Sequence, residues 1–174
     1  MSVQLARAAA ERLVERLGLH TAPIDVENLA AAVGLRIIAT GDLGADISGL
    51  LVSRDSAASI AVRKTDPPVR RRFTIAHEIG HFVLRHYMRR NELVHADEHA
   101  QVMYRSPRAS EGLDQLEVQA NQFAASLLMP SRLVREEAAK LQQPLFEDDV
   151  KVLANLFKVS EQAMTIRLTT LGLL

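Results

Sequence analysis

Two histidines and a glutamate in the run His77-Glu78-Ile79-Gly80-His81 have the residue types and the spacing of a zinc site. In a helix, residues four apart are displaced by only about 40° around the axis, so both imidazoles point to the same side. Two neutral imidazoles on adjacent turns can bind one zinc ion. Glu78 stands beside His77, where its carboxylate could take a proton from zinc-activated water. The motif therefore predicts metal-assisted hydrolysis, with His77 and His81 as ligands and Glu78 as general base.

The surrounding residues predict that this motif lies in a buried helix, from about Val69 to Arg89. The segment is apolar nearly all round, which disfavours a helix with two surface histidines. Its apolar members are Phe73, Ile75, Ala76, Ile79, Phe82, Val83 and Leu84. Burying two histidines and a glutamate costs several kcal/mol unless they have partners, and a metal ion is such a partner. His86 follows His81 by five residues, so a continued helix would turn it about 140° away from this site.

A downstream helix, from about Leu113 to Met129, offers a third ligand. Its apolar stripe consists of Leu113, Ala120, Ala124 and Leu127, and Glu117 falls on the same stripe. A lone carboxylate does not belong on a core-facing stripe. It could pair with a buried arginine, but as a zinc ligand it completes a His₂Glu set with an open position for water. That set is typical of catalytic zinc.

Composition limits the kinds of protein that could carry this site. The chain has 174 residues, of which 48% are hydrophobic and 24% charged, as expected for one globular domain. It has no cysteine, so histidine, carboxylate or backbone oxygen must bind any metal. The 21 basic and 21 acidic residues cancel, leaving no overall field that would attract nucleic acid. There is no signal-peptide core and no membrane-spanning run, so we expect a cytoplasmic location.

The order of elements predicts an α+β fold, with helices, a small mostly antiparallel sheet and then more helices. The strands are expected at residues 35–40, 47–53 and 59–64, and the polar stretch 91–112 is expected to lack regular structure. The other helices are expected at residues 3–17, 24–33, 131–141, 150–158 and 161–171, the third of them capped by Ser131. Tyr104 and Arg105 in the polar stretch could stabilise an oxyanion, a role that the sequence leaves unassigned.

The last two helices have the spacing of a helix-turn-helix. We expect a metallopeptidase domain over residues 1–145 and a helical tail over residues 146–174 packed on it. The second tail helix offers only Arg167 as a cation for DNA, whereas DNA-reading helices carry several. Direct DNA binding is therefore not expected, and packing or substrate docking is favoured.

Two blocks of sequence resemble the ImmA/IrrE metallopeptidases in content, order and spacing. They are residues 72–81 (RFTIAHEIGH) and residues 117–130 (EVQANQFAASLLMP). A weaker similarity extends over nearly the whole chain, including Pro23-Ile24-Asp25 and the run from Val159 to Met164. The resemblance implies a compact zincin-like fold around a central HExxH helix.

The resemblance also implies a function. Members are cytoplasmic proteases that cut a helix-turn-helix repressor, often encoded nearby, and so release stress-response or mobile-element genes. By this similarity, His77, His81 and Glu117 would hold one zinc ion per chain, with manganese or iron as substitutes, and Glu78 would be the general base. Two alternatives stay open: a non-catalytic regulator, and the toxin component of a pair whose partner is a helix-turn-helix protein.

Overall fold

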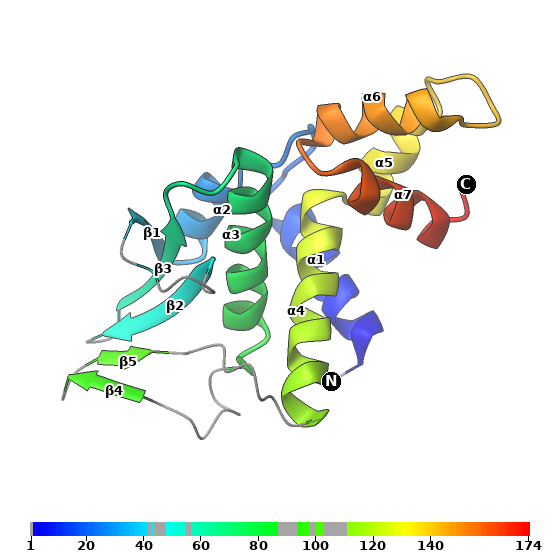
Figure 1. Cartoon of the computed structure of the whole chain (residues 1–174). Helices are drawn as coiled ribbons and strands as arrows, with labels where there is room; N and C mark the ends of the chain where they lie inside the picture. The colour runs from blue at the N-terminus through cyan, green and yellow to red at the C-terminus, as the bar shows by residue number, and fades with distance from the viewer. Residues whose placement is uncertain are drawn as a thin grey trace.

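The protein is an α+β fold in which one long helix lies between a sheet, with one short helix beside it, and the other helices (Figure 1). The computed structural model describes residues 2–41, 43, 48–54, 57–86, 94–97, 100–102 and 111–174. Within these residues the helices are α1 (Val3–Arg16), α2 (Val26–Ala32), α3 (Pro68–Val83), α4 (Glu111–Leu128), α5 (Ser131–Ala138), α6 (Glu147–Phe157) and α7 (Glu161–Thr170). The strands are β1 (Leu35–Thr40), β2 (Gly49–Arg54), β3 (Ala57–Arg63), β4 (Val94–Asp97) and β5 (Ala100–Val102).

The sheet has the strand order β1-β3-β2-β5-β4. β1 runs parallel to β3, and the other three pairings are antiparallel, so the predicted mostly antiparallel sheet is confirmed. At its centre Ile60 of β3 lies between Ile37 of β1 and Leu51 of β2. The expectation of no regular structure in residues 91–112 was wrong, because β4 and β5 lie there. Strands of four and three residues are too short to show a clear alternation of apolar and polar residues.

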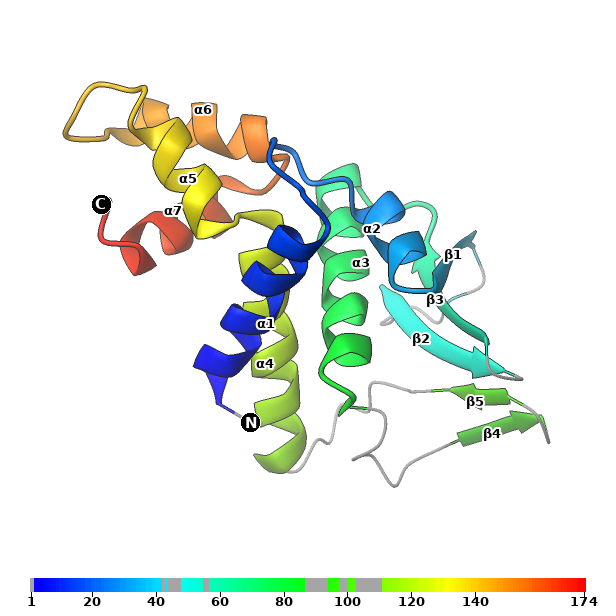
Figure 2. The ribbon, with the colours of Figure 1, turned by 180° about the vertical axis from the view of Figure 1, so that it is seen from behind.

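Helix α3 is the central element of the fold. It contacts β2 and β3 on one side and α4 on the other, an arrangement visible from both directions (Figures 1 and 2). Gly80 makes the close approach to α4 feasible: a Cβ at this position would lie 3.1 Å from Phe123 Cδ1 and 3.3 Å from the carbonyl oxygen of Ala120. The third residue of this contact, Ala120, is itself small and fully buried. Small residues therefore bring the two helices of the predicted site together.

Two helix ends differ from the predictions. α3 ends at Val83 rather than near Arg89, and the chain leaves it through Arg85, whose φ of 55° is left-handed. Ser131 does not cap α5, because it is the first residue inside that helix. Its N–H donates instead to Glu11 Oε1 of α1 at 2.9 Å. The amide of the first residue of α5 is thus satisfied by a side chain from a distant helix.

The tail helices share the hydrophobic core of the rest of the chain. Buried Leu153 and Phe157 of α6 and Met164 and Leu168 of α7 belong to one cluster with residues of α1, α3 and α4. The tail helices therefore pack against the rest of the fold. Among the described helices, none combines the length and the apolar character needed to cross a lipid bilayer.

Candidate metal centre

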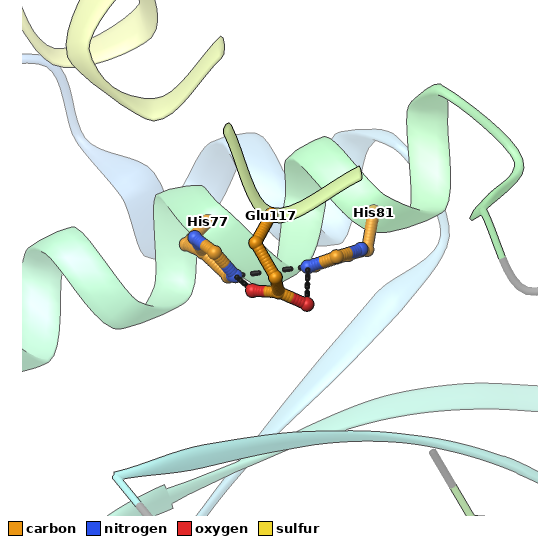
Figure 3. Close-up of side chains that lie close together, drawn as sticks. All are labelled: His77, His81 and Glu117. Carbon is orange, nitrogen blue, oxygen red and sulfur yellow. Dashed lines mark hydrogen bonds and ion pairs between the residues drawn. The ribbon is translucent and has the colours of Figure 1, made fainter. Parts of the chain in front are cut away.

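Three donor groups predicted from the sequence meet between α3 and α4 (Figure 3). His77 and His81 come from successive turns of α3, and their Nε2 atoms are 2.9 Å apart. Glu117 of α4 reaches across so that Oε2 lies 3.2 Å from His77 Nε2 and Oε1 lies 3.4 Å from His81 Nε2. All three ligand atoms lie within 4.8 Å of one another. This cluster could bind a metal ion.

The cluster is buried on the histidine side and partly open on the carboxylate side. His77 and His81 are 1% and 2% exposed, whereas the Glu117 side chain is 25% exposed. Glu117 lies on the same stripe of α4 as Ala120, which is buried against α3. Access from solvent at the carboxylate would let an ion and a further ligand reach two nitrogen donors held in the interior.

The ring of His77 is fixed by a partner on α4. Its Nδ1 lies 2.8 Å from Asn121 Oδ1. An amide oxygen only accepts hydrogen bonds, so Nδ1 carries the proton and donates. In the neutral ring, Nε2 therefore presents a lone pair toward Glu117 and His81. A lone pair on Nε2 is what a metal ligand requires, and the donor set consequently fits a divalent ion such as zinc.

His86 lies beside the site, contrary to the prediction that it would point away. It is fully buried, and its Nδ1 is 3.0 Å from His81 Nδ1. The prediction assumed that the helix continues past this residue, but α3 ends at Val83 and Arg85 turns the chain back. A glycine at the left-handed position would have signalled the turn, whereas an arginine there gives no such signal.

Burial and mutual contacts shift the pKa values of two of the donors. Burial lowers the pKa of His81, against the raising effects of its contact with Glu117 and of the nearby Glu78 charge. Burial alone would raise the pKa of Glu117, but its contacts with His77 and His81 lower it well below its usual range. The carboxylate of Glu117 is thus kept ionised, and burial favours the neutral form of the His81 ring.

Glu78 belongs to α3, and its carboxylate faces the first residue of β2. It is not one of the three converging donors. It is 4% exposed. A Cβ at Gly49, the first residue of β2, would lie 3.6 Å from Glu78 Oε1 and would collide with the side chain of Thr74. β2 can therefore approach this face of α3 only with glycine at position 49. The strand and the carboxylate are brought together next to the histidine pair.

Arg167, the cation considered for DNA contact, is in the interior. Its side chain is 7% exposed and pairs with Glu11 at 2.8 Å, while Nε donates to the carbonyl oxygen of Met129 at 2.9 Å. It is therefore not available to read DNA. Tyr104 and Arg105, considered as groups that could stabilise an oxyanion, lie outside the part of the chain that the structure describes.

Fold and site together define a metallopeptidase-like α+β domain with a potential two-histidine, one-glutamate metal centre. The model of the IrrE N-terminal-like domain, Peptidase_M78, matches residues 30–169, and the chain belongs to this family. No curated protein matches the sequence significantly. Among solved structures, a Mycobacterium tuberculosis transcriptional regulator is similar in fold, with a TM-score of 0.64 and 20% sequence identity. The match covers 97% of this chain and 47% of the regulator, so the chain spans about half the length of that protein.

Proposed function

We propose that the protein is a zinc-dependent endopeptidase whose substrate is a helix-turn-helix repressor. The observation that carries the proposal is the convergence of two imidazole nitrogens and one carboxylate at a single point between α3 and α4. Membership of a peptidase family supports the same reading. His₂Glu with a position left for water is the ligand set of catalytic zinc rather than of structural zinc.

In this proposal His77, His81 and Glu117 hold the ion through Nε2, Nε2 and the carboxylate. A bound zinc ion supplies a Lewis acid for the scissile carbonyl and lowers the pKa of water. The chain's own contribution is to hold both rings with Nε2 toward the ion and to keep the carboxylate ionised. The contact of His77 with Asn121 fixes one ring, burial favours the neutral form of His81, and the contacts of Glu117 with both rings favour its ionised form.

Glu78 moves the proton. Its carboxylate takes a proton from the attacking water and passes it to the nitrogen of the leaving amine, as a general base and then a general acid. Because Glu78 is not one of the three converging donors, its protonation can change while all three ligands stay in place. Its buried position at the start of β2 limits competition from bulk solvent.

The substrate class follows from the similarity to the ImmA/IrrE peptidases and from the state of the tail. Residues 72–81 and 117–130 carry that similarity. The buried ion pair of Arg167 with Glu11 argues against a chain that reads DNA itself. A DNA-binding partner is then the means by which this protein would act on transcription, and the cytoplasm is where it would meet that partner.

The test is to co-express the chain with a helix-turn-helix protein encoded beside it and to identify fragments by mass spectrometry. Proton transfer by a positioned side chain contributes about 10²–10⁴-fold, so Glu78→Gln should lower cleavage by that factor and keep zinc. Glu117→Gln should lose both zinc and cleavage. Glu136→Gln, an exposed glutamate of α5, is the matched control and should change neither.

Each outcome discriminates between functions. Zinc retained with cleavage lost in Glu78→Gln supports the peptidase. Zinc retained with regulation intact in Glu78→Gln, and no repressor fragments from the wild type, contradicts it and favours a non-catalytic regulator. Growth arrest that persists in Glu78→Gln contradicts it in favour of a toxin.

A further inference from the structure

His86 contacts both a candidate metal ligand and the helix that faces it. Its Nδ1 lies 3.0 Å from His81 Nδ1, and its Nε2 lies 3.2 Å from Gln119 Oε1 on α4. His81, His86 and Gln119 are 2%, 0% and 4% exposed, so bulk water does not compete for these contacts. The three side chains form a buried line that runs from the metal centre back to α4.

The direction of each hydrogen bond along this line follows from the residue at its end, Gln119. Gln119 Oε1 can only accept, so His86 Nε2 must carry the proton and donate. A neutral His86 then has a lone pair on Nδ1, which accepts from Nδ1–H of His81. With its proton on Nδ1, a neutral His81 has a lone pair on Nε2, the atom that faces His77 and Glu117.

We propose that His86 and Gln119 are positioning residues that fix the tautomer and the orientation of His81 for metal binding. The inference rests on the proposed metal centre and goes beyond its three ligands. His86 is not itself a ligand, because its Nδ1 faces Nδ1 of His81, on the side of that ring opposite the nitrogen that meets Glu117. It acts through His81 only.

The two ligand histidines are thus held in different ways by the same helix. Asn121 of α4 accepts directly from His77 Nδ1 at 2.8 Å. Gln119, two residues earlier, acts on His81 through the intervening ring of His86. Helix α4 therefore supplies Glu117 to the centre and, two and four residues later, the acceptors that orient both rings. Outer partners of this kind change metal affinity by about 10–100-fold when they are removed.

The variant test measures zinc affinity by competition with a chromophoric chelator on the full chain. His86→Leu and Gln119→Leu should each bind zinc about 10–100-fold more weakly than wild type. His86→Asn keeps an acceptor oxygen near the position of Nδ1 and should recover most of that loss. Gln122→Leu is the matched control on α4, since Gln122 bonds Arg7 and not the histidines, and its zinc affinity should equal that of wild type.

A second measurement needs no variant. Ring ¹⁵N chemical shifts of the zinc-loaded wild type should show His86 as the Nε2–H tautomer and His81 protonated on Nδ1. His86 found as the Nδ1–H tautomer would overturn the inference, as would folded leucine variants with wild-type affinity. Wild-type protein that binds no zinc would overturn the metal centre itself, so the two failures are distinguishable.

Discussion

Among the residues that the structure describes, ionisable side chains are buried in two places whose surroundings differ. Each nitrogen of the Arg167 guanidinium has its own partner: the carbonyl oxygen of Met129, Ser126 Oγ and Glu11 Oε1. In the metal centre the Nε2 atoms of two histidines and the oxygens of Glu117 instead point at one another. Burial alone therefore does not mark a ligand site.

What separates the two regions is the geometry of the donors. The partners of Arg167 surround it and join α7 to α1 and to the end of α4, so its contacts stabilise the packing of the tail. In the metal centre, contacts to Nδ1 of His77 and His81 hold the rings, while their Nε2 lone pairs converge. Two lone pairs that face each other in the interior are unfavourable until a cation lies between them. One region satisfies its charges within the fold, and the other has a converging donor set that could bind an ion.

The largest expected effect is loss of the ion when a converging donor is removed. Purified protein should carry about one divalent metal per chain, and His81→Ala or Glu117→Ala should weaken zinc binding by more than about 100-fold, the upper end of the effect of an outer partner. Chelator competition and elemental analysis measure this loss. Full metal occupancy in Glu117→Ala would remove Glu117 from the site.

The second effect concerns the buried ion pair of Arg167 with Glu11. Arg167→Met should destabilise the chain by about 3 kcal/mol, because it leaves Glu11 and the carbonyl oxygen of Met129 without their cation. Urea denaturation measures the free energy of unfolding, and the zinc affinity of the folded variant should not change. A variant as stable as wild type, or one with weakened zinc binding, would contradict the separation of the two regions.

A smaller effect is expected where α3 and α4 meet. Gly80→Ala places a Cβ 3.1 Å from Phe123 Cδ1 and 3.3 Å from the carbonyl oxygen of Ala120. Overpacking costs about 1–3 kcal/mol, and the better helix propensity of alanine offsets about 1 kcal/mol of that. We expect a net loss of about 1 kcal/mol together with weaker zinc binding, since the shift moves Glu117 away from the histidines. Unchanged zinc affinity would show that the distance between α3 and α4 does not determine the position of Glu117 relative to the histidines.

The last effect, comparable in size to that of Gly80→Ala, is a pH dependence of the metal-free chain. The folded pKa of His81 lies below that of the unfolded chain, because burial disfavours the charged ring. Below the ordinary histidine pKa of about 6.5 the unfolded chain binds more protons, so stability falls as pH falls, by up to about 1.4 kcal/mol per pH unit for this group. His81→Gln should lack this part of the slope between about pH 6.5 and 5.5. Parallel unfolding curves for both proteins over that range would contradict the assignment.

Much of the fold was predictable because its signals are local. The i to i+4 spacing of His77 and His81 and the stripe that carries Glu117 both depend on helix periodicity alone. The α+β class and the family membership, predicted from the order of elements and from two sequence blocks, are confirmed. The roles of these residues as ligands and of Glu78 as general base stay predictions.

The features that were missed depend on contacts between distant elements. His86 reaches His81 only because α3 ends early at a left-handed arginine. Nothing in the sequence distinguishes Gln119 from other polar residues of α4, because its role depends on the contact with His86. Arg167 was considered as a DNA contact because it is the cation that the second tail helix offers. Its burial was missed because its partner Glu11 lies 156 residues away in the sequence. A helical periodicity shows which face a residue occupies but not what packs against that face.

The most direct test of the central claim is a crystal of the full chain grown with zinc and measured at the zinc absorption edge. The account predicts one strong anomalous peak per chain, bonded to Nε2 of His77, Nε2 of His81 and the carboxylate of Glu117. Asn121 and His86 should remain on the Nδ1 sides of the two rings. A peak at other residues, or no peak between α3 and α4 in protein shown to contain zinc, would contradict the account.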